Sequence, residues 1–387
     1  MKIAITTPTT WPYVRRGAER FANELARYLG KRGHAVTIIS GKPGRTEVIP
    51  GDGYATICHR RLWHPSWGRF GLLEFHMFFL PCLFHLLREP FDVVVSLTFM
   101  DAFAAQIARR FGGGRSFLML NGIPPKKRYF RSLSLKGTVF GRAVRDADLV
   151  VAVSNYVREY LEARWKRKCL SLQPPVDAER FHPKAEGTSA TPVILCAAAL
   201  EDSRKGGRPL MKAFDLLKRL RPDVRLQLVA KLRPETEAAL LALVSPEWRQ
   251  DVDFSHAEED LPDLFSKATI SVLPSLWEPY GMAVIESMAA GTPVVGTRDG
   301  ALPELISNPS IGRLFDPGPD ADIEPTNVTG LAQALDECIE LAERPETSER
   351  CRAHAMRFSW QELGPRYEET MCRLVSSPQQ TDEAVRR

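Results

Sequence analysis

The sequence predicts an α/β protein built from two domains, each with a parallel sheet between helices. A chain of 387 residues is too long for one ordinary hydrophobic core and fits two domains of about 180 residues. Short apolar, β-branched runs alternate with helical stretches in both halves, and a proline-rich break separates the halves. We therefore expect a first domain at 1–175, a linker at 176–190, a second domain at 191–358 and a frayed tail at 376–387.

Composition and charge narrow the class of protein. Apolar residues at 44% and charged residues at 26% are typical of a soluble globular chain. The net charge of +5 fits anionic ligands or a membrane surface, and no aromatic-interleaved basic motif of a nucleic-acid module is present. The seven cysteines have no metal-binding spacing and indicate reduced thiols, and the N-terminus lacks a signal-peptide region. We expect a cytoplasmic protein.

The first half begins with a βαβ unit. Its strand at Lys2–Thr6 is followed by a loop containing Gly17, a helix at Phe21–Leu29 and a strand at Ala35–Ser40. Open α/β sheets bind ligands at the carboxyl ends of their strands. Asp101 follows the expected strand Phe91–Leu97, and Asn121 follows the expected strand Phe117–Leu120. Both residues therefore lie near the carboxyl ends of strands. The remaining elements of this half are strands at Phe91–Leu97, Phe117–Leu120 and Leu149–Val153, with helices at Ala102–Arg110 and from Ser154 to Trp165.

Two segments of the first half leave alternatives open. Leu72–Leu87 is apolar but is shorter than a membrane span and contains Glu74 and Pro81, so it is not a transmembrane helix. It is either a core or interdomain helix, or a peripheral membrane contact. A basic loop is either a solvated charged loop or a contact for an anionic acceptor. The loop contains Lys126, Lys127, Arg128, Arg131 and Lys136.

The second half repeats the alternation. Expected strands are Pro192–Ala199, Arg225–Ala230, Val252–Phe254, Ala268–Leu273, one from Pro293 and Gly312–Phe315. Expected helices are Leu210–Leu220, Pro234–Leu243, Leu261–Lys267, one from Gly281, Leu331–Leu341 and Arg350–Phe358.

The stretch Ser275–Ile306 combines a strand exit, a glycine-bearing turn and a helix start. The free N–H groups and positive dipole end at Gly281 suit a phosphate. Glu278 and Glu286 bracket the turn and would repel a phosphate, so they fit hydroxyl groups on either side of it. A sugar–diphosphate–ribose ligand offers that arrangement. The alternative is a surface charge at Glu278 and a solvated helix residue at Glu286.

This stretch, EPYGMAVIESMAAGTPVV, resembles the donor-binding signature of retaining glycosyltransferases of family 4, in which seven residues separate two glutamates. Lys205 matches the lysine of the family's KG motif, and RGAE around Gly17 resembles its GGxE loop. PPVD…FHP and FSW resemble the family's linker and the start of its last helix. The resemblance implies the GT-B fold, in which two Rossmann-like domains with parallel sheets face a cleft and the C-terminal helix, here at 359–375, crosses back to the first domain.

The resemblance also implies the chemistry. A hexose would pass from a UDP- or GDP-sugar, held by the second domain, to a hydroxyl of a glycan, lipid-linked or small-molecule acceptor chosen by the first domain. The anomeric configuration would be retained, without a metal or other cofactor. The expected catalytic residues are Glu278, Lys205 and Arg204. Donor binding is expected from Gly17, Gly281, Met282, Ala283, Glu286 and His256, and the sugar and acceptor side from Asn121 and Asp101.

Three departures from the family pattern qualify these expectations. Arg16 replaces the first glycine of the loop, Asn121 replaces a histidine, and Ala198-Ala199 replaces a strand-end arginine for which Arg204 is the candidate substitute. Double displacement needs a carboxylate nucleophile, and the first half offers no clear candidate. A front-face reaction, in which the leaving phosphate takes the acceptor proton, needs no such residue and tolerates Asn121, so it is favoured. The alternatives are a non-catalytic subunit that binds nucleotide sugars, and a sugar phosphorylase or epimerase. Glu304 is expected to be a charge at a helix N-terminus.

Overall fold

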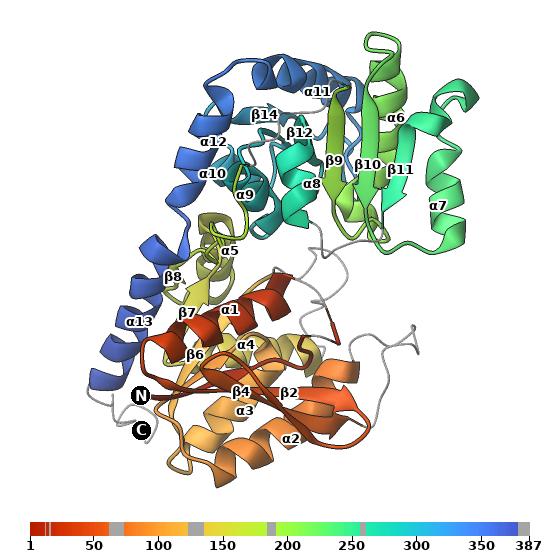
Figure 1. Ribbon diagram of the computed structural model, residues 1–387. Helices are drawn as coiled ribbons and strands as arrows, with labels where there is room; N and C mark the ends of the chain where they lie inside the picture. The colour runs from red at the N-terminus through yellow and green to blue at the C-terminus, as the bar shows by residue number, and fades with distance from the viewer. Residues whose placement is uncertain are drawn as a thin grey trace. The chain divides into compact units, whose positions relative to one another are not determined.

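The computed structural model describes residues 1–11, 13–14, 17–61, 73–122, 135–183, 191–255 and 261–377. The chain divides into two compact units. Unit 1 comprises Met1–Val153, Arg158–Leu172 and the chain from Gly364, and unit 2 comprises Ser154–Val157 and Gln173–Leu363. Each unit is an α/β structure built on one mainly parallel sheet (Figure 1).

The sheet of unit 1 has the strand order β3-β4-β2-β1-β5-β6-β7-β8, and only β3 runs antiparallel to its neighbour. Strand β5 is buried along its whole length and β1 is buried after Lys2, as expected for a parallel sheet covered on both faces. The strands are β1 (Lys2–Thr6), β2 (Ala35–Pro43), β3 (Glu47–Pro50), β4 (Tyr54–Arg61), β5 (Val93–Ser96), β6 (Arg115–Leu120), β7 (Leu149–Ala152) and β8 (Leu170–Ser171).

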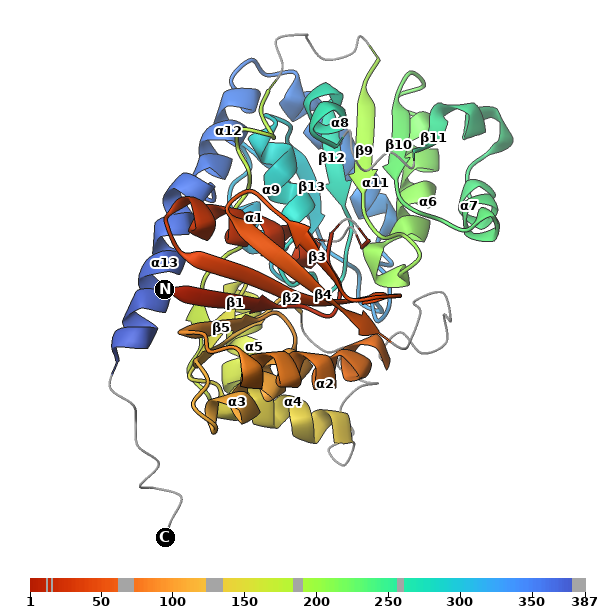
Figure 2. The same cartoon turned by 60° about the horizontal axis from the view of Figure 1, so that its bottom comes forward.

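Helices cover both faces of this sheet, with α1 on one face and α2 and α3 on the other (Figure 2). Helix α1 buries Phe21, Leu25 and Leu29, which recur at four-residue spacing on one side of the helix. The helices of unit 1 are α1 (Gly17–Lys31), α2 (Leu73–Arg88), α3 (Phe99–Arg109), α4 (Leu135–Asp146) and most of α5 (Asn155–Trp165).

The C-terminal helix α13 (Trp360–Ser376) packs into unit 1 from Gly364 onward, in agreement with the expected return of the chain. Tyr367 is fully buried, donates a hydrogen bond to the Leu172 carbonyl at 3.2 Å and contacts the Phe21 ring. Glu368 pairs with both Arg32 and His34 at 3.0 Å. These contacts attach the end of the chain to α1 and to the residues that follow it.

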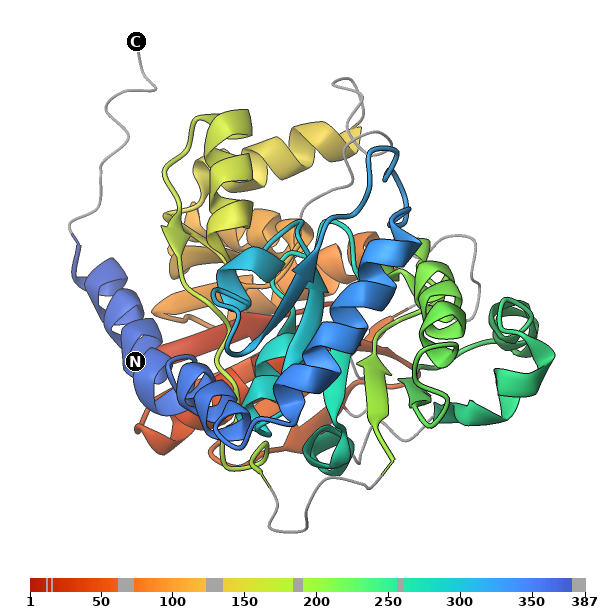
Figure 3. The ribbon, with the colours of Figure 1, turned by 90° about the horizontal axis from the view of Figure 1, so that it is seen from above.

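The sheet of unit 2 is parallel throughout, in the order β11-β10-β9-β12-β13-β14. One face packs against α6 and α11, whose buried Leu210, Phe214, Leu331 and Leu335 share one hydrophobic core with the strands (Figure 3). The strands are β9 (Val193–Ala197), β10 (Arg225–Val229), β11 (Val252–Ser255), β12 (Ile270–Leu273), β13 (Val294–Thr297) and β14 (Gly312–Phe315).

The helices of unit 2 agree with most of the predicted positions, with bounds that shift by a few residues. They are α6 (Gly207–Lys218), α7 (Pro234–Leu241), α8 (Leu261–Lys267), α9 (Met282–Ala289), α10 (Leu302–Leu305), α11 (Val328–Ala342) and α12 (Thr347–Met356), with the 3₁₀ helices η1 (Ser203–Lys205) and η2 (Pro246–Asp251). Helices α8 and α9 pack on strands β9 and β12, and α12 packs on α9.

Two elements of unit 1 differ from expectation. The hairpin of β3 and β4 was not predicted, because β3 is a largely exposed edge strand without a buried face. Helix α1 begins at Gly17, one turn before the expected start at Phe21. The apolar segment near Leu72 forms helix α2, which buries Phe78, Cys82 and Leu86 against the sheet and α3. No helix in the described part of the chain is long and apolar enough to cross a membrane.

Candidate functional site

The predicted catalytic residues meet at the point where the strand order of unit 2 reverses. From β9 the chain continues outward to β10 and β11, and it then returns to β12 on the other side of β9. In open parallel sheets, ligands bind at the carboxyl ends of the strands at such a switch point. Lys205 follows β9 and Glu278 follows β12, so both side chains lie at this edge of the sheet.

Lys205 and Glu278 form an ion pair there. The Lys205 Nζ donates to the Glu278 Oε2 at 2.7 Å. The Lys205 side chain is 24% exposed and the Glu278 side chain is 10% exposed, so the pair is partly shielded from water. The structure thus brings together, across 73 residues of sequence, a cation and a carboxylate that were predicted separately.

The turn that carries Glu278, here called the Glu278 turn (residues 276–281), is held by neighbouring loops. The Leu276 N–H donates to the Arg204 carbonyl at 2.8 Å, and the Ala301 N–H donates to the Glu278 carbonyl at 2.9 Å. Trp277 has a left-handed φ of 53°, which is rare for a bulky residue, and its N–H donates to the Asp299 carboxylate. A strained conformation fixed by surrounding bonds is common at functional sites.

Asp299 was not identified from the sequence as a residue that shapes the site. A Cβ at Gly300, whose φ is +63°, would lie 2.6 Å from the Glu278 carbonyl oxygen. Glycine therefore permits the close approach of these two backbones. The DG pair after β13 marks a turn, and Gly300 begins the stretch Gly300–Glu304, which resembles the family's GGxxE turn.

Helix α9 begins immediately after the Glu278 turn. Its N-cap Gly281 has a φ of 104°, and a Cβ there would lie 2.9 Å from the Leu302 side chain. Met282 and Ala283 are the first helical residues, whose N–H groups have no partner within a helix. Glu286 is 3% exposed and lies one turn further into the helix. The predicted donor residues of this stretch therefore follow one another along a single strand–turn–helix unit.

Arg204 lies beside this site but its guanidinium pairs with a neighbour. It donates to both carboxylate oxygens of Asp202, with 3.1 Å from Nε to Oδ2. Burial acts to raise the pKa of Asp202, but the hydrogen bonds and charge of Arg204 outweigh burial and lower it. Ala199, which stands where the family pattern has an arginine, is exposed at the end of β9. A role for Arg204 on a diphosphate would require it to leave or share Asp202.

Unit 1 contains a corresponding switch point, between β1 and β5. Gly17 is the exposed first residue of α1, after the loop that leaves β1. Glu19, in the first turn of α1, is buried and accepts a hydrogen bond from the Thr9 hydroxyl, which fastens this loop. Asn121 follows β6, and within the described residues its side-chain Nδ2 has no hydrogen-bond partner.

Asp101, expected on the acceptor side, is fully buried in the first turn of α3. Its two carboxyl oxygens find no hydrogen-bond partner in the described ranges of the chain. Burial raises the pKa of Asp101 to about 8, and the nearby Thr98 side chain acts in the opposite direction. Contact between this carboxyl and a ligand would require the surrounding side chains to move.

Several predicted features lie outside the described residues. They are His256, Arg16, the basic-loop residues at 126–131, the linker at 184–190 and the tail from 378. In the ranges that the structure does describe, no group of three or more His, Cys, Asp or Glu side chains is arranged to hold a metal ion.

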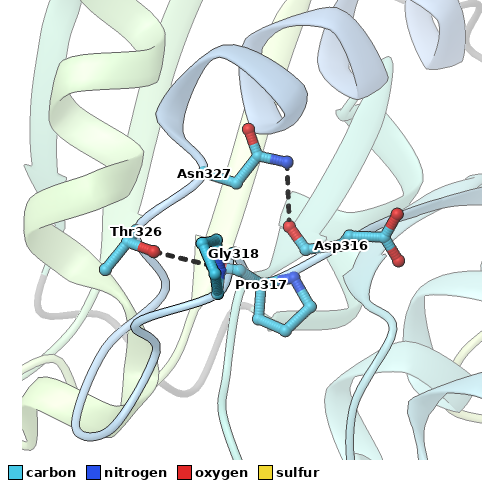
Figure 4. A pocket seen from close by; sticks show the side chains of 6 residues that line it. Asp316, Pro317, Gly318, Thr326 and Asn327 are labelled. Atoms are coloured by element: carbon cyan, nitrogen blue, oxygen red, sulfur yellow. Dashed lines mark hydrogen bonds between the residues drawn. The ribbon is translucent and has the colours of Figure 1, made fainter.

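A hollow of about 600 Å³ lies at the end of the edge strand β14 (Figure 4). The Asn327 amide donates to the Asp316 carbonyl at 3.1 Å, and the Thr326 hydroxyl donates to the Pro317 carbonyl. These bonds close the loop that precedes α11. None of the predicted site residues lines this hollow.

Two family models match the chain. The model described as Glycosyltransferase Family 4 matches residues 15–180, and the model described as Glycosyl transferases group 1 matches residues 191–340. The two matches lie on either side of the predicted linker.

Curated relatives and solved structures agree with these models. The chain is 32% identical over 200 residues to the mannosylfructose-phosphate synthase of Agrobacterium fabrum, covering 46% of this chain and 44% of the relative. It is 29% identical over 250 residues to the GDP-mannose-dependent alpha-(1-6)-phosphatidylinositol monomannoside mannosyltransferase of Mycolicibacterium smegmatis, covering 59% and 64%. The matches thus span less than two thirds of each relative's length. The sucrose-phosphate synthase of Thermosynechococcus elongatus shares the fold, with a TM-score of 0.80 at 19% identity over 96% of this chain and 98% of that chain.

Proposed function

Because the chain belongs to glycosyltransferase family 4 and has the GT-B fold, we propose that it is a hexosyltransferase that uses a nucleotide-diphosphate sugar as donor. The observation that carries this proposal is the Lys205–Glu278 pair at the switch point of unit 2, directly before the N-terminus of α9. Helix N-termini at the ends of parallel strands are suited to phosphate groups.

Each component of the site has a distinct task in this proposal. The first N–H groups of α9 and the Lys205 ammonium stabilise the negative charge that develops on the departing diphosphate. Glu278 and Glu286 accept hydrogen bonds from hydroxyl groups of the transferred sugar and of the ribose. Arg204 adds positive charge when a diphosphate competes with Asp202 for its guanidinium. Gly17 allows the backbone of the β1–α1 loop to approach the donor.

We propose that the sugar is transferred with retention and by the front-face route. Double displacement requires a carboxylate nucleophile about 5 to 5.5 Å from its catalytic partner across the sugar. Glu278 is ion-paired with Lys205, and the amide of Asn121 cannot accept a proton near neutral pH. The leaving phosphate oxygen is then the base for the acceptor hydroxyl. Detection of a glycosylated Glu278 by intact-mass spectrometry during turnover would reject this route.

The proposed donor is a UDP- or GDP-sugar, and the reaction is proposed to need no metal or other cofactor. GDP-mannose is the first donor to test, because a relative carries the name of a GDP-mannose-dependent enzyme. The acceptor is proposed to be a hydroxyl of a glycan, a glycolipid or a small metabolite, recognised by unit 1. Activity that is unchanged by a metal chelator is the expected outcome.

The proposed activity is tested in two steps. Thermal-shift screening with nucleotide sugars identifies the donor, because a ligand at about 100 times its dissociation constant adds about 2.7 kcal/mol to stability. Release of the nucleoside diphosphate is then measured with and without acceptors, for the wild type and for Glu278→Ala and Lys205→Ala. Turnover that is abolished in both variants supports the proposal. Nucleotide-sugar binding without turnover across an acceptor panel would instead favour a non-catalytic binding subunit.

We further propose a cytoplasmic location with peripheral contact at the inner face of the cell membrane. Helix α2 exposes Leu80, Phe84 and Leu87 on the side away from its buried residues, and the exposed Arg88 ends this helix. Apolar and basic groups on one helix are typical of an interfacial helix. Co-sedimentation with anionic lipid vesicles tests this contact, and Phe84→Ser is expected to weaken it. Equal sedimentation of Phe84→Ser and the wild type would contradict it.

A further inference from the structure

Two side chains of unit 2 satisfy the leading backbone N–H groups of helix α5. The Glu304 carboxylate accepts from the Asn155 N–H at 2.9 Å and from the Tyr156 N–H at 2.7 Å. The Ser154 hydroxyl accepts from the Val157 N–H at 3.1 Å, as an N-cap serine does. Glu304 lies in the first turn of its own helix α10, as expected, and its carboxylate also caps a helix that begins 149 residues earlier in the chain.

The capping serine also reaches the Glu278 turn. The Ser154 hydroxyl donates to the Pro279 carbonyl at 2.6 Å, and the Ser154 side chain is 1% exposed. Pro279 directly follows Glu278. Lys205 and Asp299, which also bond to this turn, lie in the loops after the adjacent strands β9 and β13. Ser154 is instead contributed by a segment 125 residues from Pro279, which belongs to unit 2 only through the four residues 154–157.

Glu304 also acts on Tyr280, the residue of the Glu278 turn that precedes Gly281. Tyr280 is 4% exposed, and burial followed by the charge of Glu304 raises the pKa of its hydroxyl. The Glu304 carboxylate therefore lies near both the first turn of α5 and the residue that precedes Gly281. The positive end of the α5 dipole stabilises this negative charge.

We infer that Glu304 and Ser154 are positioning residues for Glu278. Glu304 holds the first turn of α5 in place, this turn holds Ser154, and the Ser154 hydroxyl fixes the Pro279 carbonyl beside Glu278. The inference rests on the proposed function and deepens it, because it assigns the orientation of the sugar-binding carboxylate to a cap outside the turn itself. Neither residue contacts the donor in this scheme. The nucleoside diphosphate is held by Lys205 and α9. Loss of the cap should therefore affect the binding of the sugar end of the donor and not that of the nucleoside diphosphate.

The test compares Glu304→Gln and Ser154→Ala with a matched control in the full-length chain. Glu349→Gln is the control, because Glu349 is an exposed acid in the first turn of α12 in unit 2. Each test variant is expected to lower kcat/KM for the nucleotide sugar by at least about tenfold, which corresponds to about 1.4 kcal/mol. Affinity for the nucleoside diphosphate alone is expected to change less than about twofold, and the control is expected to behave as the wild type.

Two further variants separate positioning from a general loss of stability. Ser154→Thr keeps the hydroxyl and is expected to restore most of the activity that Ser154→Ala loses. The double variant of Ser154→Ala and Glu304→Gln is expected to lose little more than either single variant, because both changes release the same turn. Additive losses, or failure of the threonine variant to restore activity, would contradict the inference.

Hydrogen exchange tests the inference without any ligand. Peptides covering residues 276–280 are expected to exchange faster in Glu304→Gln and Ser154→Ala than in the wild type and in Glu349→Gln. Unchanged exchange there would overturn the inference, whether or not a nucleotide sugar binds. The inference would also be overturned if Glu304→Gln and Ser154→Ala kept wild-type activity while Glu278→Ala lost it. That result would leave the proposed function intact. A wild-type chain that neither binds nor turns over any nucleotide sugar, with faster exchange in both variants, would reject only the proposed function.

Discussion

Breaking the Lys205–Glu278 ion pair tests whether the two side chains stabilise each other in solution. Their charged atoms lie 2.7 Å apart, with side-chain exposures of 24% and 10%. Two unit charges about 4 Å apart attract by about 4 kcal/mol at an effective dielectric constant near 20. Loss of hydration by both groups offsets much of this attraction. We therefore expect a coupling free energy of about 1 to 2 kcal/mol between the two side chains.

A double-mutant cycle with Lys205→Met, Glu278→Gln and the double variant measures this coupling. Lys205→Met leaves a shielded carboxylate without its cation and is expected to lower the free energy of unfolding by about 2 kcal/mol. Glu278→Gln keeps an oxygen that accepts from Lys205 and is expected to cost about 1 kcal/mol. The double variant is expected to lose less than the sum of the two.

Urea unfolding followed by tryptophan fluorescence is the assay. Because the chain has two units, the transition that reports unit 2 is identified by the shift that Lys218→Met produces in it. If the loss of unfolding free energy in the double variant equals the sum of the two single losses to within about 0.5 kcal/mol, the two side chains are not coupled. That result would also refute the ion pair as the resting state of the site.

Three further predictions concern separate features of the two units. Gly281→Val places a side chain against Leu302 at a φ of 104°. This variant is expected to weaken nucleoside-diphosphate binding, measured by calorimetry, by at least about tenfold. Unchanged affinity would contradict the role of the Glu278 turn in nucleotide binding. Lys218 is fully buried and pairs with Asp251 at 2.8 Å, so Lys218→Met is expected to lower the unfolding free energy by about 3 kcal/mol with unchanged donor affinity. Burial raises the pKa of Asp101 to about 8, so the folded state binds a proton that the unfolded state releases above about pH 4. The free energy of unfolding should therefore fall by about 1.4 kcal/mol per pH unit between about pH 5 and 8. Asp101→Asn should remove this slope. Equal pH dependence of the wild type and Asp101→Asn would show that the Asp101 pKa is not raised.

Local sequence patterns predicted most of the strands and helices, because each buried strand is a short apolar run followed by a helix with one apolar side. Helix α9 and strand β12 were identified in this way, together with the glycine between them. The hairpin of β3 and β4 was missed because β3 is exposed and only four residues long. Local periodicity provides no signal for such an edge strand.

The contacts that shape the site were harder to predict than its main residues. Glu278, Lys205 and Gly281 belong to motifs that can be recognised in the sequence. Glu304 looked like an ordinary N-terminal helix charge, and its cap on α5 depends on the folding of a segment 149 residues away. The pairing of Arg204 with Asp202 is local, yet the sequence allowed either this pairing or a free guanidinium. Spacing along the chain does not decide between such partners.

Calorimetric titration with GDP, UDP and ADP tests most directly whether Lys205 and the Glu278 turn form a nucleotide-diphosphate site. We predict that one nucleoside diphosphate binds per chain, and that Lys205→Met and Gly281→Val each weaken it by at least about tenfold, or about 1.4 kcal/mol. The Glu349→Gln control should bind as tightly as the wild type. Absence of binding by all three nucleotides, or equal affinity in Gly281→Val and the wild type, would contradict the assignment of the donor site to this switch point.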